Sequence, residues 1–163
     1  MNVFKSSILA LAKNFRKCSN RIISYKIGDT AELTKTFTKE DVSVFAQITG
    51  DSNPIHQDED FAKSSLFGRP IVHGVLVNGL ISAVLGTKLP GPGTAVLSQE
   101  LKFLSPLYIG EPVTARIEIS KMNRRLVQCQ AICFVPARDK IILTGTVKLL
   151  APSGLDLNSH ETS

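Results

Sequence analysis

Asp51 and His56 are the two residues of this chain whose types and spacing suggest acid–base chemistry. They lie in the stretch ITGDSNPIHQDEDFA, residues 48–62. Asn53 and Pro54 between them favour a turn, and a chain that folds back over five residues can bring two side chains to one site. A carboxylate beside an imidazole can hold a water molecule or pass a proton. On spacing alone, a connecting turn with an ordinary loop histidine is the simpler explanation.

A second candidate site lies in VHGVLVNG, where Gly74 comes just before a long apolar segment. The first N–H groups of a helix are unpaired, and the helix dipole there favours negative charge. A glycine at this point lets a ligand approach the backbone, so the site can stabilise a carbonyl oxygen that becomes anionic. His73 and Asn78 are further candidates for ligand binding. The structural alternatives are a simple helix start, a packed histidine and a buried amide with a protein partner.

Metal and phosphate motifs are missing from the sequence. The acidic run at residues 58–60 has no histidine or cysteine support for a metal cluster and is best explained as a solvated helix start. The cysteines Cys18, Cys129 and Cys133 have neither metal-ligand spacing nor the pattern of a disulfide framework. We therefore expect no metal and no cofactor.

The positive charge of the chain is concentrated at its N-terminus. The net charge is +5, but residues 1–28 hold six basic residues and no acid, which leaves −1 for residues 29–163. The body has scattered basic residues without an aromatic array, so nucleic-acid binding has little support. No apolar run reaches the ~18 residues that a membrane-spanning helix needs.

The N-terminal segment has the composition of a mitochondrial transit peptide. Its apolar residues share one helical face, basic residues recur between them, serines are present and acids are absent. The apolar positions are Phe4, Ile8, Leu11 and Phe15. A surface helix of the mature fold is the alternative. We expect residues 1–28 to be a transit peptide that is cleaved somewhere between about 17 and 28, and we expect the mature protein in the mitochondrial matrix.

The helices that must position the candidate residues can be predicted from local signals. A helix over 39–49 is indicated by Thr38 as N-cap with Asp41 three residues later, and by Gly50 at its end. The loop with Asp51 and His56 follows, and a short helix is expected over 58–64. From about 74 to 88 the chain is apolar almost all round, which is typical of a buried helix.

The remainder of the body is predicted to form an antiparallel sheet. A first strand is expected over 31–37, and four long strands joined by short turns fill the region from about 95 to 150. A very apolar helix and a sheet with one apolar face can bury their apolar surfaces against each other. The simplest arrangement has the sheet wrapped around the helix. The sequence therefore predicts a single α+β domain over 29–152, followed by a polar tail over 153–163.

FAQITGDSNPIHQDEDFA, residues 45–62, resembles the hydratase-2 motif of the MaoC-like (R)-specific enoyl-thioester hydratases. In that family an aromatic residue is followed by Gly-Asp-x-Asn-Pro-aliphatic-His and, six positions later, a small residue. This chain fills those places with Phe45, Gly50, Asp51, Asn53, Pro54, Ile55, His56 and Ala62. Residues 67–94 and 101–119 are also similar to the family, so the likeness covers about 30 to 150. With its basic leader, the chain resembles the mitochondrial 3-hydroxyacyl-thioester dehydratases (type 2).

The resemblance implies a hot-dog fold, usually paired as a homodimer, and a lyase that reversibly dehydrates (3R)-3-hydroxyacyl thioesters. Asp51 and His56 would be the catalytic pair, and the Gly74 amide would bind the thioester oxygen. The acyl group would be carried by acyl carrier protein or coenzyme A. We expect the neighbouring polar or turn-forming residues to contribute to substrate binding: Asn53, Pro54, His73 and Asn78.

Two other functions remain compatible with a hot-dog fold, namely an acyl thioesterase and a non-catalytic acyl-thioester binding module. The Asp-x-Asn-Pro-x-His loop favours the dehydratase over both. The chain-length preference, the identity of the carrier and the division of the proton transfers between Asp51 and His56 cannot be assigned from the sequence.

Overall fold

The computed structural model describes residues 25–152, and the expected cleavage region before residue 25 and the polar tail lie outside them. The strands are β1 (Thr30–Thr36), β2 (Ala95–Phe103), β3 (Pro112–Asn123), β4 (Leu126–Val135) and β5 (Lys140–Leu150). The helices are α2 (Lys39–Thr49), α3 (Pro54–Gln57), α4 (Glu59–Ser64), α5 (Gly74–Thr87) and the 3₁₀-helix η2 (Pro136–Arg138).

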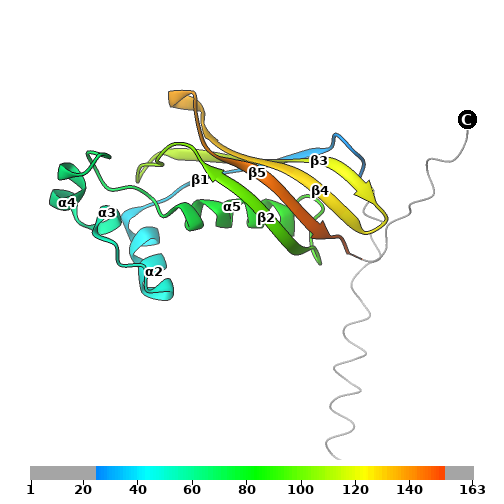
Figure 1. The fold of residues 1–163 in the computed structure, drawn as a ribbon, viewed down its shortest axis with the longest axis horizontal. Coiled ribbons are helices and arrows are strands. Elements are labelled where there is room, and N and C mark those ends of the chain that lie inside the picture. Colours follow the sequence, from blue (N-terminus) through cyan, green and yellow to red (C-terminus); the bar gives the residue numbers. More distant parts are fainter. Residues whose placement is uncertain (1–24, 153–163) are drawn as a thin grey trace, which may run out of the picture. The chain divides into compact units, whose positions relative to one another are not determined.

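The five strands form one antiparallel sheet in the order β1-β3-β4-β5-β2. Figure 1 shows α5 lying along one face of this sheet. The strand pattern predicted from alternation is confirmed, because the apolar side of β3 is fully buried. Its buried residues are Val113, Ala115, Ile117 and Ile119, and on β4 the two cysteines Cys129 and Cys133 lie in the same core. A single antiparallel sheet around one long helix is the predicted hot-dog arrangement.

The predicted limits of α2 are confirmed by its capping contacts. The Thr38 hydroxyl accepts a hydrogen bond from the Asp41 amide at 3.1 Å, and the Asp41 carboxylate accepts one from the Thr38 amide at 2.9 Å. This reciprocal pair satisfies two N–H groups that the first turn leaves unpaired. The helix ends at Gly50, whose φ of +78° favours glycine. Asp51 therefore leaves the helix in a defined direction.

The predicted burial of the apolar helix is found for most of α5 but not for one of its faces. Residues Val77, Leu80, Ile81, Val84 and Leu85 are buried, but Val75 is 66% exposed. The edge strand β2 also leaves apolar side chains in solvent, among them Leu97 and Phe103. The reason is that one sheet face covers only one side of a helix. An apolar surface along α5 and β2 therefore remains open in the single chain.

The folded part of the chain starts no later than Tyr25, which is buried. Three residues on, the Gly28 amide donates a hydrogen bond to the Ile119 carbonyl of β3 at 2.9 Å. The domain thus includes residues that the sequence analysis assigned to the leader. Within residues 25–152, no helix has the length and apolar character needed to span a membrane.

Candidate active site

The turn after α2 contains a one-turn helix, α3, where the sequence analysis predicted a loop. Asn53 is its N-cap and accepts a hydrogen bond from the Ile55 amide through its side-chain oxygen, at 3.3 Å. Pro54 occupies the first helical position, where its missing N–H costs nothing. The helix carries His56 inward, so the asparagine and proline of the motif set the direction of the histidine. Asn53 and Pro54 themselves are exposed.

His56 is held as a neutral base. Its side chain is buried, and Nδ1 lies 2.8 Å from the Ile71 carbonyl oxygen. A carbonyl can only accept, so Nδ1 carries the proton and the Nε2 lone pair is free. Burial lowers the pKa of His56 below its ordinary 6.5, and the neighbouring His73 lowers it further. The bond to Ile71 and the charge of Asp51 act in the opposite direction but do not outweigh the burial.

His73 lies against both members of the candidate pair. Its ring stacks on the ring of His56 with centroids 3.8 Å apart and planes at 27°. Its Nε2 is 3.1 Å from the Asp51 carbonyl oxygen, so it donates there, and 4.0 Å from the Asp51 carboxylate. Its side chain is 2% exposed, and Nδ1 has no hydrogen-bond partner among the described residues. The ring of Phe45 packs against it, with centroids 4.9 Å apart.

The structure brings Asp51, His56 and His73 together, with one nitrogen or carboxylate oxygen from each within 4.8 Å of the others. The Asp51 side chain is 51% exposed, so its carboxylate faces solvent while both imidazoles are covered. The two imidazole rings are stacked, and each ring already donates one N–H to a backbone carbonyl. A shared metal would need lone pairs that converge on one point. The arrangement suits proton transfer better than metal binding.

Gly74 is the first residue of α5 and follows His73 directly, so a helix N-terminus opens beside the two histidines. A Cβ added to Gly74 would lie 2.8 Å from the Phe103 ring. Gly74 and Phe103 line a cavity of about 470 Å³ whose other walls are mostly apolar. Those walls are Leu66, Phe67, Ile71, Val72, Val77, Leu104, Ser105, Pro106, Leu107 and Ile142. A ligand in this cavity can reach the unpaired amides of the helix start.

A second, smaller cavity of about 220 Å³ borders His56 from the side of α2 and α4. Lys39 and Glu59 form an ion pair on its wall, and Ser43, Gln57, Pro70 and Ile109 complete the lining. Four of these six side chains are polar, so the cavity can hold water close to the His56 imidazole.

Asn78 lies apart from the three clustered residues. Its amide nitrogen donates to the Gln99 side chain of β2 at 2.9 Å, whereas its oxygen is buried without a partner among the described residues. Two groups at the site were not predicted from the sequence, the Ile71 carbonyl that orients His56 and the Phe103 ring that packs on Gly74. A carbonyl acceptor leaves no side-chain signal in the sequence. The Phe103 contact depends on strand placement, which no local pattern fixes.

The fold is that of the hot-dog class, with one carboxylate and two imidazoles close together beside the start of its long helix. A family model for the MaoC like domain matches residues 25–132. Because this match covers more than half of the chain, the chain belongs to the MaoC-like hydratase 2 family, and it is a hydratase or dehydratase.

Named relatives agree with this assignment. The chain is 41% identical over 127 residues to the 3-hydroxybutyryl-CoA dehydratase of Methylorubrum extorquens, covering 78% of this chain and 81% of the relative. It is 27% identical over 155 residues to the mitochondrial 3-hydroxyacyl-[acyl-carrier-protein] dehydratase of Arabidopsis thaliana, covering 93% and 91%. Among solved structures, the (R)-hydratase of Aeromonas caviae superposes with a TM-score of 0.76 at 35% identity, covering 79% of this chain and 98% of that one.

Proposed function

We propose that this protein reversibly dehydrates (3R)-3-hydroxyacyl thioesters to trans-2-enoyl thioesters in mitochondrial type II fatty-acid synthesis. The observation that carries the proposal is the approach of Asp51 and His56 within 4.8 Å beside the N-terminus of α5. Proton abstraction next to a thioester carbonyl needs a base, a proton carrier for the leaving hydroxyl and a donor for the carbonyl oxygen. His56, Asp51 and Gly74 can supply these three functions.

In the proposed reaction, the thioester oxygen accepts a hydrogen bond from the Gly74 amide. As the α C–H bond breaks, negative charge grows on that oxygen, and the helix N-terminus stabilises it. The electron pair forms the C=C bond and expels the β-hydroxyl, which takes up a proton and leaves as water. His56 and Asp51 share the proton that moves from the α-carbon to the hydroxyl. In the reverse direction they orient the attacking water.

The mitochondrial part of the proposal rests on the acid-free basic leader and on the mitochondrial relative from Arabidopsis thaliana. The more similar relative is bacterial, so the catalytic body alone does not indicate a compartment. The carrier can be acyl carrier protein or coenzyme A. We also propose a homodimer, because the open apolar surface along α5 and β2 needs a cover.

The direct test is hydration of crotonyl-CoA, followed by the loss of enoyl absorbance. Asp51→Asn and His56→Ala should each lower kcat by about 10²–10⁴-fold, the usual contribution of a positioned acid–base group. Both variants should keep the wild-type circular dichroism. Asp60→Asn removes an exposed acid of α4 and serves as the matched control. Near-normal rates in both single variants and in the double variant would show that the site is elsewhere.

The same reaction mixtures distinguish the thioesterase and the binding module. A thioesterase releases free thiol, which a thiol reagent detects, whereas a dehydratase releases none. A binding module retains the thioester without turnover. Thiol release at the rate of absorbance loss would therefore contradict the dehydratase.

A further inference from the structure

Two arginines from distant parts of the chain lie around one aromatic ring at the end of the domain that carries α3 and α4. The guanidinium carbon of Arg69 is 3.8 Å from the centroid of the Tyr108 ring, and that of Arg138 is 5.2 Å away. Both arginines pair with Glu111, at 3.2 Å for Arg69 and 2.8 Å for Arg138. Two cations therefore share one carboxylate, and the cluster keeps an excess positive charge.

Most of the N–H groups of this arginine pair are not used within the domain. Arg69 is 57% exposed and its only hydrogen bond among the described residues goes to Glu111. Arg138 donates through one nitrogen to Glu111 and to the Pro106 carbonyl, while its Nε is buried without a partner in the described part of the chain. Each guanidinium presents five donors in a planar fork that matches the oxygens of a phosphate.

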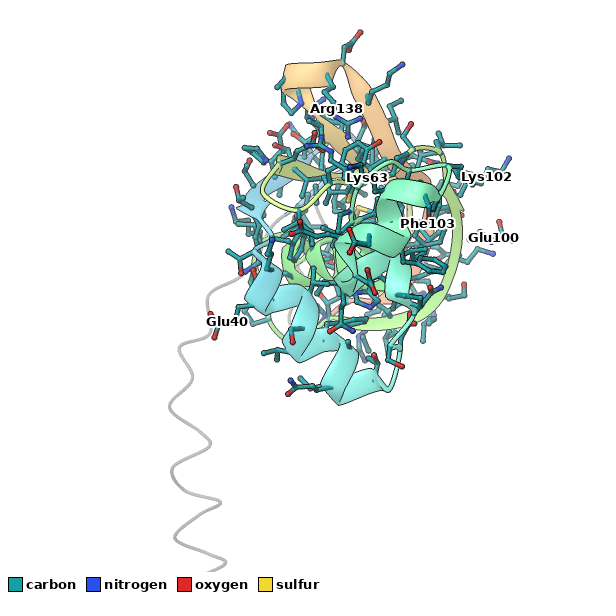
Figure 2. All side chains as sticks on the ribbon, turned by 90° about the vertical axis from the view of Figure 1, so that its left-hand side faces the viewer. Glu40, Lys63, Glu100, Lys102, Phe103 and Arg138 are labelled. Carbon is teal, nitrogen blue, oxygen red and sulfur yellow. The ribbon has the colours of Figure 1, made fainter. Side chains whose placement is uncertain are left out.

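The arginine pair is connected to the cavity beside Gly74 through two residues of the cavity wall. The Tyr108 hydroxyl donates to the Phe67 carbonyl at 3.3 Å, and Arg138 donates to the Pro106 carbonyl at 3.0 Å. Phe67 and Pro106 line the 470 Å³ cavity together with Gly74. Figure 2 looks onto this end of the domain and labels Arg138 beside η2 and Phe103 where β2 ends. A chain-like ligand with its carbonyl at Gly74 can thus follow the cavity towards the two guanidinium groups.

We propose that Arg69 and Arg138 bind the phosphate at the end of the pantetheine arm of the thioester substrate. This inference rests on the proposed function, since it assigns the part of the substrate that lies beyond the thioester. Coenzyme A and acyl carrier protein both attach the acyl group through a phosphopantetheine arm, so one phosphate site serves either carrier. Charge-assisted bonds from a guanidinium to a phosphate are short, directional and stronger than neutral ones.

A purely structural arginine offers a matched comparison. Arg116 is also about half exposed, pairs with Glu32 and lies 5.4 Å from the centroid of the Phe134 ring. It belongs to β3 and pairs across to β1, at the sheet edge opposite β2. Neither Glu32 nor Phe134 lines the cavity, whereas Arg138 donates to the lining residue Pro106. Arg116→Gln therefore removes a charge, an ion pair and an aromatic contact without touching the proposed phosphate site.

The experiment compares crotonyl thioesters of four carriers on the full chain: pantetheine, 4′-phosphopantetheine, coenzyme A and acyl carrier protein. Arg69→Gln should raise KM about tenfold for the three carriers that hold the phosphate, the size expected for one charge-assisted contact. The KM for the pantetheine thioester should change less than about twofold. Arg69→Lys keeps the charge but loses the fork and should give an intermediate effect. Arg116→Gln should behave as wild type on all four.

Each other outcome has a definite meaning. An equal rise in KM for the pantetheine thioester would mean that the arginines only stabilise the cavity wall at Phe67, and it would overturn the proposal. Unchanged KM values on every carrier would overturn it too. A loss confined to coenzyme A would assign the contact to its nucleotide and overturn the shared phosphate site. If the wild-type protein hydrates none of the four thioesters, the proposed function is wrong. If it hydrates the pantetheine thioester, the function stands, and only the phosphate site is being tested.

Discussion

His56 links the local structure of the site to the pH dependence of the reaction. The form of His56 that can accept a proton is the neutral imidazole. Burial lowers the pKa of this imidazole below 6.5. More than half of the imidazole should therefore still be neutral at pH 6.5, so the rate should fall to half its maximum only at a lower pH. We expect the acidic limb of kcat/KM for crotonyl-CoA, measured between about pH 5 and 8, to have its midpoint below 6.5. A midpoint above 6.5 would contradict the buried, neutral imidazole.

A variant of His73 tests the cause of this shift. Among the groups around His56, His73 lowers its pKa and Asp51 raises it. The Lys39–Glu59 ion pair also lines the cavity that borders His56. In His73→Gln the contribution that lowers the pKa of His56 is removed, while the glutamine amide can still donate to the Asp51 carbonyl. The acidic limb should then move to higher pH. A merely structural role of His73 would lower the melting temperature without moving the limb.

The contact between α5 and β2 brings the Phe103 ring against Gly74, the proposed oxyanion donor. A methyl group on Gly74 would lie 2.8 Å from the Phe103 ring, which is partly exposed and can turn away. Gly74→Ala should therefore leave the melting temperature nearly unchanged but push the ring into the cavity. We expect a loss of about 10–10³-fold in kcat/KM, since removing one oxyanion donor outright costs about 10²–10³-fold in kcat.

Phe103→Ala in the same chain provides the control for that prediction. It removes the ring that the new methyl group displaces, so the double variant should recover part of the activity that Gly74→Ala loses. Losses that simply multiply in the double variant would mean that the two positions act independently. The Gly74 effect would then have to be assigned to the backbone itself.

Elements with local signals were predictable, and elements defined by distant contacts were not. The capping pair Thr38–Asp41 and the alternation of β3 are encoded within a few residues, and both are found as predicted. The close approach of β2 to β5 is not encoded locally. A Cβ on Gly145 would lie 2.0 Å from the Glu100 carbonyl oxygen, so this glycine is required by a strand that lies 45 positions earlier. The short helix α3 was missed because Asn-Pro signals a turn and a helix start alike.

The candidate site could be predicted in its residues but not in its arrangement. The motif identifies Asp51 and His56, and the apolar helix identifies Gly74. The stacking of His73 on His56 depends on how the segment before α5 crosses α3, which is a tertiary property. The Ile71 carbonyl that fixes the tautomer of His56 is equally a product of this crossing. The sequence therefore identifies the candidate acid–base residues, whereas long-range packing sets the tautomer of His56.

At the scale of the whole molecule, the buried position of Tyr25 limits where a leader can be removed. Cleavage after this residue would expose the core position that its ring fills, and cleavage after Gly28 would also remove the hydrogen bond to Ile119. The proposed transit peptide should therefore end before Tyr25, within the earlier part of the 17 to 28 window expected from composition.

The open apolar surface along α5 and β2 leads to the last prediction, a homodimer of this chain. A stable interface buries about 800 Å² on each partner, and β2 is an edge strand with unpaired backbone groups, a liability that proteins usually cover. Light scattering after size exclusion should give a mass near twice that of the 17.7 kDa chain.

Val75→Glu places a charge on this surface and should give a monomer. Ile27→Glu charges an equally exposed apolar residue next to β1, at the other edge of the sheet, and should remain dimeric. A monomeric wild type at micromolar concentration, or dissociation caused equally by both variants, would contradict this surface as the interface. Because Phe103 and Leu104 are exposed here and also line the cavity beside Gly74, dissociation should reduce activity together with mass.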